Sequence, residues 1–376
     1  MRVTLPRTRT LLITTAGVAV LVAALLAGIT LHRAPPPPAN GSAAPPLPAD
    51  PVRGFLTNYV DPDGRVVRRD QGGDTVSEGQ AYAMLLAVAS VDEATFDRVW
   101  NWTRTQLHRA DGLLSWKYDG RITDANSAAD ADLDAAHALV AAAATFDRPE
   151  YRAEGIRLGT AVLDHETAQT ALGRVLVAGS WATEAPYAVN PSYFAPAAIE
   201  TLSKASGDSR WSQLADGYGA LLEQTTAETR LPSDWVQVTT SGKVEPMPPP
   251  GNGPVGFGLD AARIPVRAAI SCRPQDRAEA AKLTAVLARG NEQIRGSYDL
   301  GGGPTVDWQH PLAFVAAAAA ATAAGDEQAA NRLMAGAADL NRRTPTYYGA
   351  AWTALGAVWL DGRPDPISPC AERAKP

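Results

Sequence analysis

The 376-residue sequence places three acidic side chains where helices are predicted to begin, a position from which a carboxyl group can reach into a cleft. Glu78 follows Ser77, and Ser77 with Gln80 has the spacing of a capping box. Asp130 and Asp260 stand at two later helix starts. A carboxyl group that donates a proton in catalysis needs a raised pKa, whereas a helix N-terminus lowers it. Glu78 is therefore either a proton donor in unusual surroundings or a simple complement to the helix dipole.

Asp130 belongs to an aspartate-rich segment, 124–134. Asp130 and Asp134 are four residues apart and would share one helix face, whereas Asp132 would point elsewhere. Like charges so close destabilise a helix mildly unless something uses them, so sugar hydroxyls are a candidate ligand. A calcium loop competes with this interpretation, but the distal Glu at the required spacing is absent. The alternative without a ligand is that Asp130 caps the helix and its neighbours are solvated.

Asp260 stands three residues before Arg263. On a helix this spacing lets the guanidinium pair with the carboxylate and hold it ionised. An ionised carboxylate can accept a proton from water, which is the task of a general base. The alternative is an ordinary surface ion pair, which would contribute little.

Aromatic side chains supply the argument for a sugar ligand. Trp116, Trp181, Trp235 and Trp308 lie in predicted connectors, and Tyr193 is close to one of them. Flat rings on loops are suited to stacking on pyranose faces through C–H contacts. The alternative is that these rings anchor their own loops. The other tryptophans follow helical patterns and are predicted core residues: Trp100, Trp102, Trp211, Trp352 and Trp359.

A mostly helical domain must position these residues. Beyond residue 50 the pattern predicts twelve helices, paired across short turns that carry caps or helix breakers. One helix of a pair is often rich in alanine, as at 316–321, and its partner is more charged, which predicts inner and outer positions. Six hairpins closed in a ring form an (α/α)6 barrel; an open α-solenoid, disfavoured by the lack of a fixed-period repeat, and a two-lobed bundle are the alternatives. The predicted helices are 51–60, 78–90, 92–108, 132–146, 149–165, 193–205, 208–225, 257–271, 275–290, 311–324, 326–341 and 346–360.

Long connectors rich in glycine, proline and aromatic residues separate the pairs. Such loops are uncommon in a compact domain unless they serve a function. Each leads into the first helix of the next pair, so we expect them to gather at one end of the barrel and frame a cleft. Short strands are predicted at 113–116, 175–181 and 234–238. The connectors are 109–129, 170–191, 230–256 and 290–310.

The N-terminal region is predicted to lie outside this fold. Residues 11–31 carry no charge and would span about 31 Å as a helix, enough for a bilayer core. Arginines precede them, which favours a cytoplasmic N-terminus and an exported remainder. The prediction is a membrane anchor or a signal segment at 1–33, followed by a proline-rich linker at 34–51 and a catalytic domain at 52–376. If the first segment is not cleaved, the domain is held on the outer face of the membrane; if it is cleaved, the domain is secreted.

Charge and cysteine content exclude several classes of protein. The net charge is −6, and residues 1–49 contribute four arginines and no acids, so the rest carries 30 basic and 40 acidic residues. A domain this acidic has no electrostatic case for nucleic acid. Cys272 and Cys370 are too few for a zinc site; they either form a disulfide that ties the C-terminal tail to a helix end or remain free. We expect no metal or other cofactor.

Taken in order, five segments resemble the family 8 glycoside hydrolases, specifically the endoglucanase branch associated with bacterial cellulose synthesis. The similarity covers most of residues 52–360. The matching segments are Ser-Glu-Gly-Gln-Ala-Tyr at 77–82, Asn-Ser-Ala-Ala-Asp-Ala-Asp at 126–132, Asn-Pro-Ser-Tyr at 190–193, Ser-Asp-Trp-Val at 233–236 and Asp-Ala-Ala-Arg at 260–263.

The resemblance implies an (α/α)6 barrel that hydrolyses β-1,4-linked glycans with inversion. By position Glu78 would be the general acid, Asp260 the general base, and Asp130 an active-site residue at the sugar that is cleaved. The expected substrate-binding residues are Trp116, Asp132, Tyr193, Trp235 and Arg263. The expected partners are a β-1,4-linked polysaccharide, the membrane through the N-terminal segment, and the machinery of polysaccharide synthesis. The catalytic domain is expected to be monomeric.

Three other functions remain open at this stage. The enzyme could act on another glycan, such as chitosan, xylan or an exopolysaccharide. It could be a polysaccharide lyase, for which His137 or Tyr193 would supply the base. It could also be a non-catalytic, anchored glycan-binding protein.

Overall fold

The computed structural model describes residues 50–227, 229–363 and 365–370. The predicted anchor and most of the predicted linker lie outside these residues. Within them, no helix combines the length and apolar character that crossing a membrane requires. The Asp50 carboxylate caps the first helix, α1 (Pro51–Tyr59), so the fold begins just before the predicted residue 52.

Six helices form an inner ring. Except in α6 (Pro196–Ser206), where only the first turn and one face are buried, their side chains are buried on nearly all sides, as a helix that is apolar all round requires. In α11 the six alanines 316–321 are all fully buried, which lets neighbouring helices approach closely. The inner helices are α2 (Ser77–Ala89), α4 (Ala129–Thr145), α6 (Pro196–Ser206), α8 (Arg263–Ala269), α11 (Pro311–Ala323) and α13 (Tyr347–Trp359).

The remaining helices surround this ring and have one buried face. In α12 the buried residues recur at helical spacing, and its charged residues face solvent. Asp92 and Asp326 cap α3 and α12, and a proline opens α5 and α9, so the turns before these four helices end in a helix start signal. Besides α1, the outer helices are α3 (Glu93–Gln106), α5 (Pro149–His165), α7 (Arg210–Thr225), α9 (Pro274–Lys282), α10 (Thr284–Leu287) and α12 (Glu327–Arg343).

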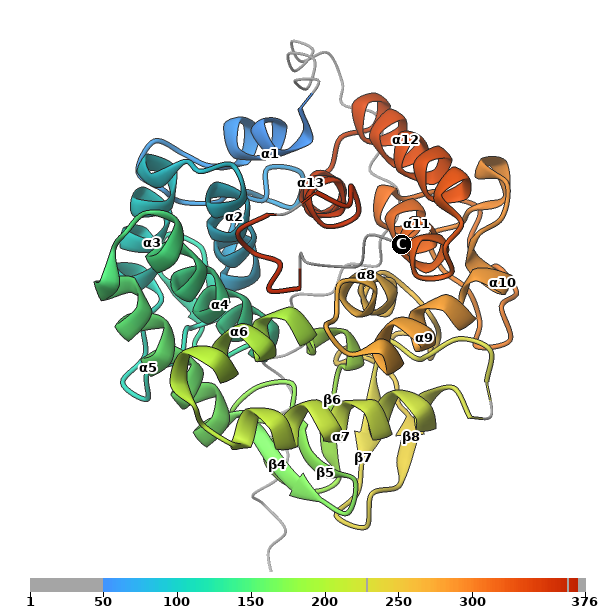
Figure 1. Cartoon of the computed structure of the whole chain (residues 1–376), viewed down its shortest axis with the longest axis horizontal. Coiled ribbons are helices and arrows are strands. Elements are labelled where there is room, and N and C mark those ends of the chain that lie inside the picture. The colour runs from blue at the N-terminus through green and yellow to red at the C-terminus, as the bar shows by residue number, and fades with distance from the viewer. Residues whose placement is uncertain (1–49, 228, 364, 371–376) are drawn as a thin grey trace, which may run out of the picture.

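The inner ring closes on itself. Each inner helix packs on the next, from α2 through α4, α6, α8 and α11 to α13, and α13 returns to α2. The first helix, α1, packs against the last, α13, so the two ends of the fold complete the sixth pair (Figure 1). The prediction of an (α/α)6 barrel is confirmed, and neither an open solenoid nor a two-lobed bundle has this closure.

Three details of the helix prediction are wrong. The predicted helix 257–271 begins only at Arg263, because residues 258–262 form turns: the Gly258 carbonyl accepts from the Ala262 amide, and the Asp260 carbonyl accepts from the Arg263 amide. The predicted helix 275–290 is split into α9 and α10. The predicted helix 193–205 starts at Pro196 after a short 3-10 turn, η1 (Pro191–Tyr193), because Pro196 fits the first turn of a helix.

The capping box predicted for α2 is also wrong. Val76 occupies the cap position, and the buried Ser77 hydroxyl has no hydrogen-bond partner among the described residues. Gln80 reaches away from its own helix instead. It accepts from the Val66 amide and donates to the Thr103 hydroxyl, at 2.5 and 2.9 Å, which ties α2 to α3.

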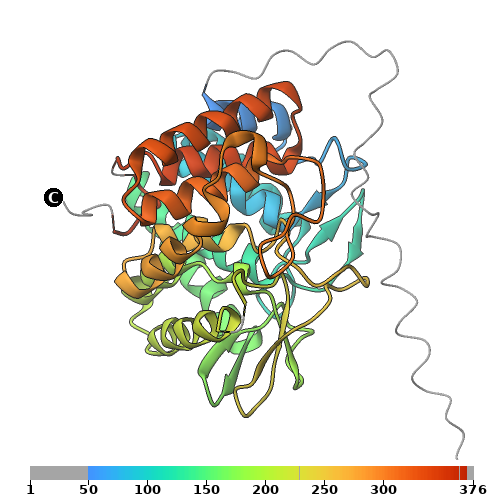
Figure 2. The same ribbon diagram turned by 90° about the vertical axis from the view of Figure 1, so that its right-hand side faces the viewer.

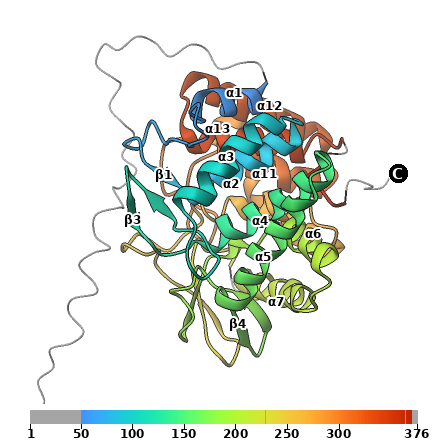
Figure 3. The same ribbon diagram turned by 90° about the vertical axis from the view of Figure 1, so that its left-hand side faces the viewer.

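Three small antiparallel sheets and the long connectors lie at one end of the barrel (Figures 2 and 3). The inner helices all begin at this end, as predicted from the connectors that lead into them. The strand expected at 113–116 lies just after these residues, at β2, and the strands expected at 175–181 and 234–238 correspond to β5 and β7. The sheets are β1 (Thr75–Val76), β2 (Lys117–Tyr118) and β3 (Ile122–Asp124); β4 (Thr167–Thr170) and β5 (Gly173–Leu176); β6 (Tyr187–Val189), β7 (Val236–Val238) and β8 (Val244–Pro246).

A disulfide joins Cys272 to Cys370. Cys272 follows the C-terminal end of α8, so the bond fixes the C-terminal segment at the end of the barrel opposite the connectors. The structure therefore selects the disulfide from the two alternatives that the sequence left open.

Candidate active site

A cleft of about 540 Å³ opens at the end of the barrel where the inner helices begin. Its walls come from the first turns of four inner helices and from the connectors before them. Residues far apart in the sequence therefore meet in one place. The lining includes Arg68, Glu78, Trp116, Asp130, Tyr193, Asp234, Asp260, Arg263, Ser297, Trp308, Tyr347 and Tyr348.

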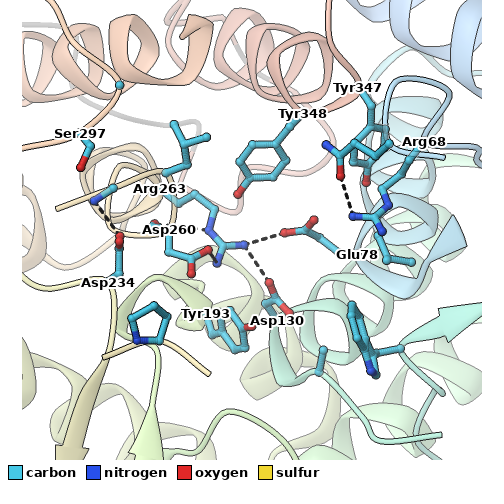
Figure 4. Close-up of a pocket in the computed structure, with 18 of the residues that line it drawn as sticks. Arg68, Glu78, Asp130, Tyr193, Asp234, Asp260, Arg263, Ser297, Tyr347 and Tyr348 are labelled. Atoms are coloured by element: carbon cyan, nitrogen blue, oxygen red, sulfur yellow. Dashed lines mark hydrogen bonds and ion pairs between the residues drawn. The ribbon is translucent and has the colours of Figure 1, made fainter. Parts of the chain in front are cut away.

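Arg263 is the centre of this cleft, and all three predicted acids bind its guanidinium. One terminal nitrogen contacts Glu78 at 2.7 Å and Asp130 at 2.8 Å. The other contacts Asp260 at 3.0 Å. The Arg263 side chain is only 1% exposed, so its charge needs these partners to offset its loss of hydration. Figure 4 shows Glu78 and Asp260 on either side of the guanidinium.

A second ion pair lies one helical turn deeper. Arg267 on α8 contacts both oxygens of Asp134 on α4, at 2.8 and 2.7 Å, and both side chains are about 2% exposed. Asp130 and Asp134 do share a helix face, as predicted from their spacing. Their partners Arg263 and Arg267 are also four residues apart, so α4 and α8 are held in register by two buried pairs.

The surroundings of Glu78 favour its protonated form. Burial raises the pKa of this carboxyl to about 7, and the charges of Asp130 and Asp260 act in the same direction. Arg263 and a 2.7 Å hydrogen bond from the Tyr82 hydroxyl oppose this rise. Burial therefore outweighs the lowering of this pKa that the helix N-terminus would cause, and Glu78 can still hold a proton near neutral pH.

Asp260 is held differently. Its side chain is 36% exposed, and each oxygen accepts from one donor. Arg263 contacts Oδ1, and the indole N–H of Trp235 donates to Oδ2 at 3.0 Å. The carboxylate is thus fixed in direction while it stays open to the cleft, as a group that must contact water requires.

Asp130 is almost fully buried between the two. Its Oδ1 accepts from the Ala131 amide at 2.9 Å, and its Oδ2 faces Arg263. Burial raises the pKa of Asp130, and Arg263 opposes the rise. Asp130 is therefore placed to act on Glu78 through their shared guanidinium and through its charge.

The separation of Glu78 and Asp260 is bounded by their common partner. Their bonded oxygens can be no further apart than the two hydrogen bonds and the width of one guanidinium allow. This limit is compatible with the roughly 6.5–9.5 Å that inverting glycosidases leave between their two carboxyl groups. A sugar and an attacking water need such a gap.

The structure corrects two of the predicted contacts with substrate. Asp132 is fully buried and points away from the cleft, where it accepts from the Leu114 amide at 2.8 Å. Trp235 is 6% exposed and lies behind Asp260 rather than in the cleft wall. Trp116 and Tyr193 do line the cleft, and the Tyr193 ring lies 5.1 Å from the Arg263 guanidinium.

Several residues of the cleft were not among the predicted site residues. Tyr347 and Tyr348 open α13, and Trp308 closes the connector before α11. The rule that inner helices begin at the cleft could have found them. Asp234 lies within a segment already noted for its resemblance. Burial, and then the charge of Asp260, raises its pKa to about 7.

No cluster of three or more His, Cys, Asp or Glu side chains among the described residues is arranged to hold a metal ion. His137, one of the bases considered for a lyase, is 2% exposed and does not line the cleft. Burial lowers its pKa to about 4. Tyr193, the other base considered for a lyase, does line the cleft.

Comparison with known proteins agrees with this geometry. The family model described as "Glycosyl hydrolases family 8" matches residues 53–362. A probable endoglucanase from Novacetimonas hansenii is 32% identical over 220 residues, which cover 56% of this chain and 64% of that protein. An endoglucanase from Cellulomonas uda is 30% identical over 220 residues, covering 56% of this chain and 60% of that protein. The matches thus span less than two thirds of these relatives.

A solved structure extends the similarity to nearly the whole barrel. A family 8 endoglucanase from Klebsiella pneumoniae superposes with a TM-score of 0.70 at 27% identity. The alignment covers 82% of this chain and 97% of that one.

Proposed function

Because this chain belongs to glycosyl hydrolase family 8, we propose that it cleaves β-1,4-linked glucan internally, as an inverting endoglucanase. The observation that carries the proposal is the arrangement of Glu78 and Asp260 around Arg263. One carboxyl has a pKa raised to about 7, and the other is open to the cleft. Two carboxyl groups with such different environments are suited to acid and base roles.

In this mechanism Glu78 donates its proton to the glycosidic oxygen as the bond to the leaving sugar breaks. Asp260 accepts a proton from a water that attacks the anomeric carbon from the opposite face. The new bond forms on that face, so the configuration is inverted. Glu78 ends the step as a carboxylate, and the nearby Arg263 stabilises the new negative charge.

Asp130 and the aromatic rings complete the site. The charge of Asp130 adds to the burial that raises the pKa of Glu78, and Asp130 lines the cleft in which the sugar would be cleaved. Trp116 and Trp308 present rings to the cleft, where pyranose faces can stack. The names of the similar proteins, which are endoglucanases, support glucan as the substrate.

We also propose that the enzyme acts outside the cytoplasm. The arginines before the uncharged segment 11–31 support export. The disulfide between Cys272 and Cys370 fits an oxidising compartment. The resemblance to enzymes of cellulose synthesis makes polysaccharide-synthesis machinery a candidate partner.

The test is hydrolysis of soluble cellulose derivatives, with xylan, chitosan and mixed-linkage glucan in parallel. We expect new reducing ends from the β-1,4-glucans, and NMR should show the inverted anomer first. Glu78→Gln should remove this activity and keep the fold. Glu327→Gln is the matched control, because Glu327 also lies in the first turn of a helix but is exposed and far from the cleft.

Each other outcome selects an alternative. Release of sugars from chitosan or xylan alone would change the substrate. Unsaturated, UV-absorbing products would indicate a lyase. Binding without turnover on every glycan would indicate a binding protein, and a retained anomer would remove Asp260 from the role of base.

A further inference from the structure

Asp234 holds the backbone on both sides of Asp260. Its Oδ1 accepts from the amide of Gly258 at 2.9 Å and from the amide of Ala261 at 2.7 Å. The Asp234 amide donates to the Gly256 carbonyl at 2.8 Å, so main chain and side chain fasten the same connector. In Figure 4 Asp234 lies beside Asp260, away from Glu78 and Asp130.

The next residue, Trp235, binds the side chain of Asp260 rather than its backbone. Its indole N–H donates to Oδ2 at 3.0 Å. Two consecutive residues therefore help to fix one carboxylate: Asp234 sets the path of the turn, and Trp235, together with Arg263, sets the direction of the carboxyl group. Trp235 itself is fixed, because its carbonyl accepts from the Met247 amide and its ring meets Tyr193 edge-on.

The backbone of Asp260 needs this support because it lies outside a regular helix. It lies in a segment of turns, residues 258–262, three residues before α8 begins. Its side chain is 36% exposed, so packing does not fix it. If the Asp234 carboxyl were removed, the amides of Gly258 and Ala261 would lose their hydrogen-bond acceptor, and the turn could take other conformations.

Gly258 gives independent support for a close fit. A Cβ atom at this position would lie 2.5 Å from the Oδ2 atom of Asp234. Any other residue at 258 would therefore force the Asp234 carboxyl away from the turn. The Asp234 carboxyl can therefore approach the turn this closely only because residue 258 has no side chain.

We propose that Asp234 is a positioning residue that acts through Asp260, by holding the turn 258–262 so that the base faces the attacking water. The inference rests on the proposed function of Asp260. It does not give Asp234 a proton to transfer. A displacement of a reacting group by about 1 Å can cost roughly 100-fold in rate, so a loss of this size is expected when the turn is released.

The first experiment compares three variants of Asp234 on the glucan that the wild type hydrolyses. Asp234→Ala removes the acceptor, and we expect kcat to fall about 10- to 100-fold with little change in KM. Asp234→Asn keeps an oxygen for the same two amides and should recover most of the rate. Asp234→Glu lengthens the side chain and shifts the turn, so kcat should fall even though the charge is kept.

Asp299→Ala is the matched control. Asp299 also accepts two backbone N–H groups with one oxygen, from Gly301 and Gly303 at 2.9 Å each, but it does not line the cleft. We expect this variant to retain the wild-type kcat. Thermal unfolding of every variant separates loss of the fold from loss of position, and Asp234→Glu serves if the alanine variant does not fold.

The second experiment is a double-mutant cycle with Asp260→Asn. If Asp234 acts only through the base, Asp234→Ala should cause no further loss once the base is gone. Equal losses in both backgrounds would overturn the inference, as would wild-type kcat in Asp234→Ala and Asp234→Glu. An asparagine variant as slow as the alanine variant would also overturn it. A wild type inactive on every glycan would instead overturn the proposed function and, with it, this inference.

Discussion

Glu78, on the inner helix α2, and Asp260, in the turn before α8, are 182 positions apart in the chain, yet their carboxyl groups bind the two terminal nitrogens of one guanidinium, that of Arg263. A single buried cation therefore sets the distance between the two groups that would act as acid and base. Burial raises the pKa of Glu78; the charge of Arg263 opposes this rise, and the charge of Asp130 adds to it. Burial and these charges together set the pH at which the proton donor is available.

The first prediction concerns the pH dependence of the wild type. Glu78 must carry its proton to act as an acid, and its pKa is about 7. We expect kcat/KM to fall as the pH rises above about 7, because the carboxyl is then ionised. Initial rates between about pH 4 and pH 9, with the fold monitored by circular dichroism, measure this. Full activity at the alkaline end would contradict the assignment.

The second prediction uses a substitution that removes one oxygen atom. The Tyr82 hydroxyl donates to Glu78 at 2.7 Å and so favours its ionised form. In Tyr82→Phe the pKa of Glu78 should rise, and the alkaline limb of the rate profile should move to higher pH. Tyr218→Phe is the control, since this buried hydroxyl lies in α7, away from the cleft. A shift in the control, or none in Tyr82→Phe, would count against the role of Glu78.

The third prediction reverses the sign of that shift. The charge of Asp130 raises the pKa of Glu78. Asp130→Asn removes the charge and keeps a similar shape, so the alkaline limb of the residual activity should move to lower pH. The rate itself should also fall, because Asp130 lines the cleft and binds Arg263, which holds Glu78 and Asp260. An alkaline limb that moves upward, or stays in place, would show that Asp130 does not act on Glu78.

The fourth prediction separates the two arginines of α8. Arg263 and Arg267 are one turn apart and both buried, but only Arg263 lines the cleft. Lysine cannot bridge two carboxyl groups as a guanidinium does. Arg263→Lys should lower both kcat and stability, whereas Arg267→Lys should lower stability, by about 3 kcal/mol, and leave kcat largely unchanged. Urea unfolding and initial rates measure the two effects; an equal loss of kcat in both would contradict this division.

The sequence could predict the barrel and its three acids because the signals are local. Caps, breakers and alanine-rich runs mark the helices, and the acids lie at or just before their starts. Asp132 is expected at the substrate only from the resemblance, whereas the helical spacing already predicts that it points away from the face shared by Asp130 and Asp134; in α4 it accepts a hydrogen bond from the Leu114 amide. Trp235 directly precedes β7, so its direction depends on how that strand pairs, which no local pattern reveals.

The pKa values and long-range contacts that determine the chemistry of the site could not be predicted from the sequence. The pKa of Glu78 depends on burial and on Arg263, which is 185 positions away in the sequence. Likewise, Asp234 matters only because its connector folds over the turn before α8. Such relationships follow from which helix ends meet in the closed ring, and spacing along the chain does not contain them.

The fifth prediction concerns two carboxyl groups buried beneath the cleft, Asp132 and Glu166. Both side chains are fully buried, and burial raises the pKa of Glu166 to about 8 from its usual 4.5. Burial and the charge of Glu166 also raise the pKa of Asp132 well above its usual value. Between about pH 4.5 and pH 8 the folded protein therefore keeps a proton on Glu166, whereas the unfolded chain has already released it. Over this window the free energy of unfolding falls as the pH rises.

Glu166→Gln removes this titration and should make stability less dependent on pH. Relative to the wild type, the variant should gain on the order of 3 kcal/mol between about pH 5 and pH 8, because it has no proton to lose. Chemical denaturation at both pH values measures the difference. Glu327→Gln, on the exposed first turn of α12, should show no such gain. A Glu166→Gln variant that is less stable than the wild type at the higher pH would mean that the carboxyl is ionised in the folded state and held by partners that stabilise its charge.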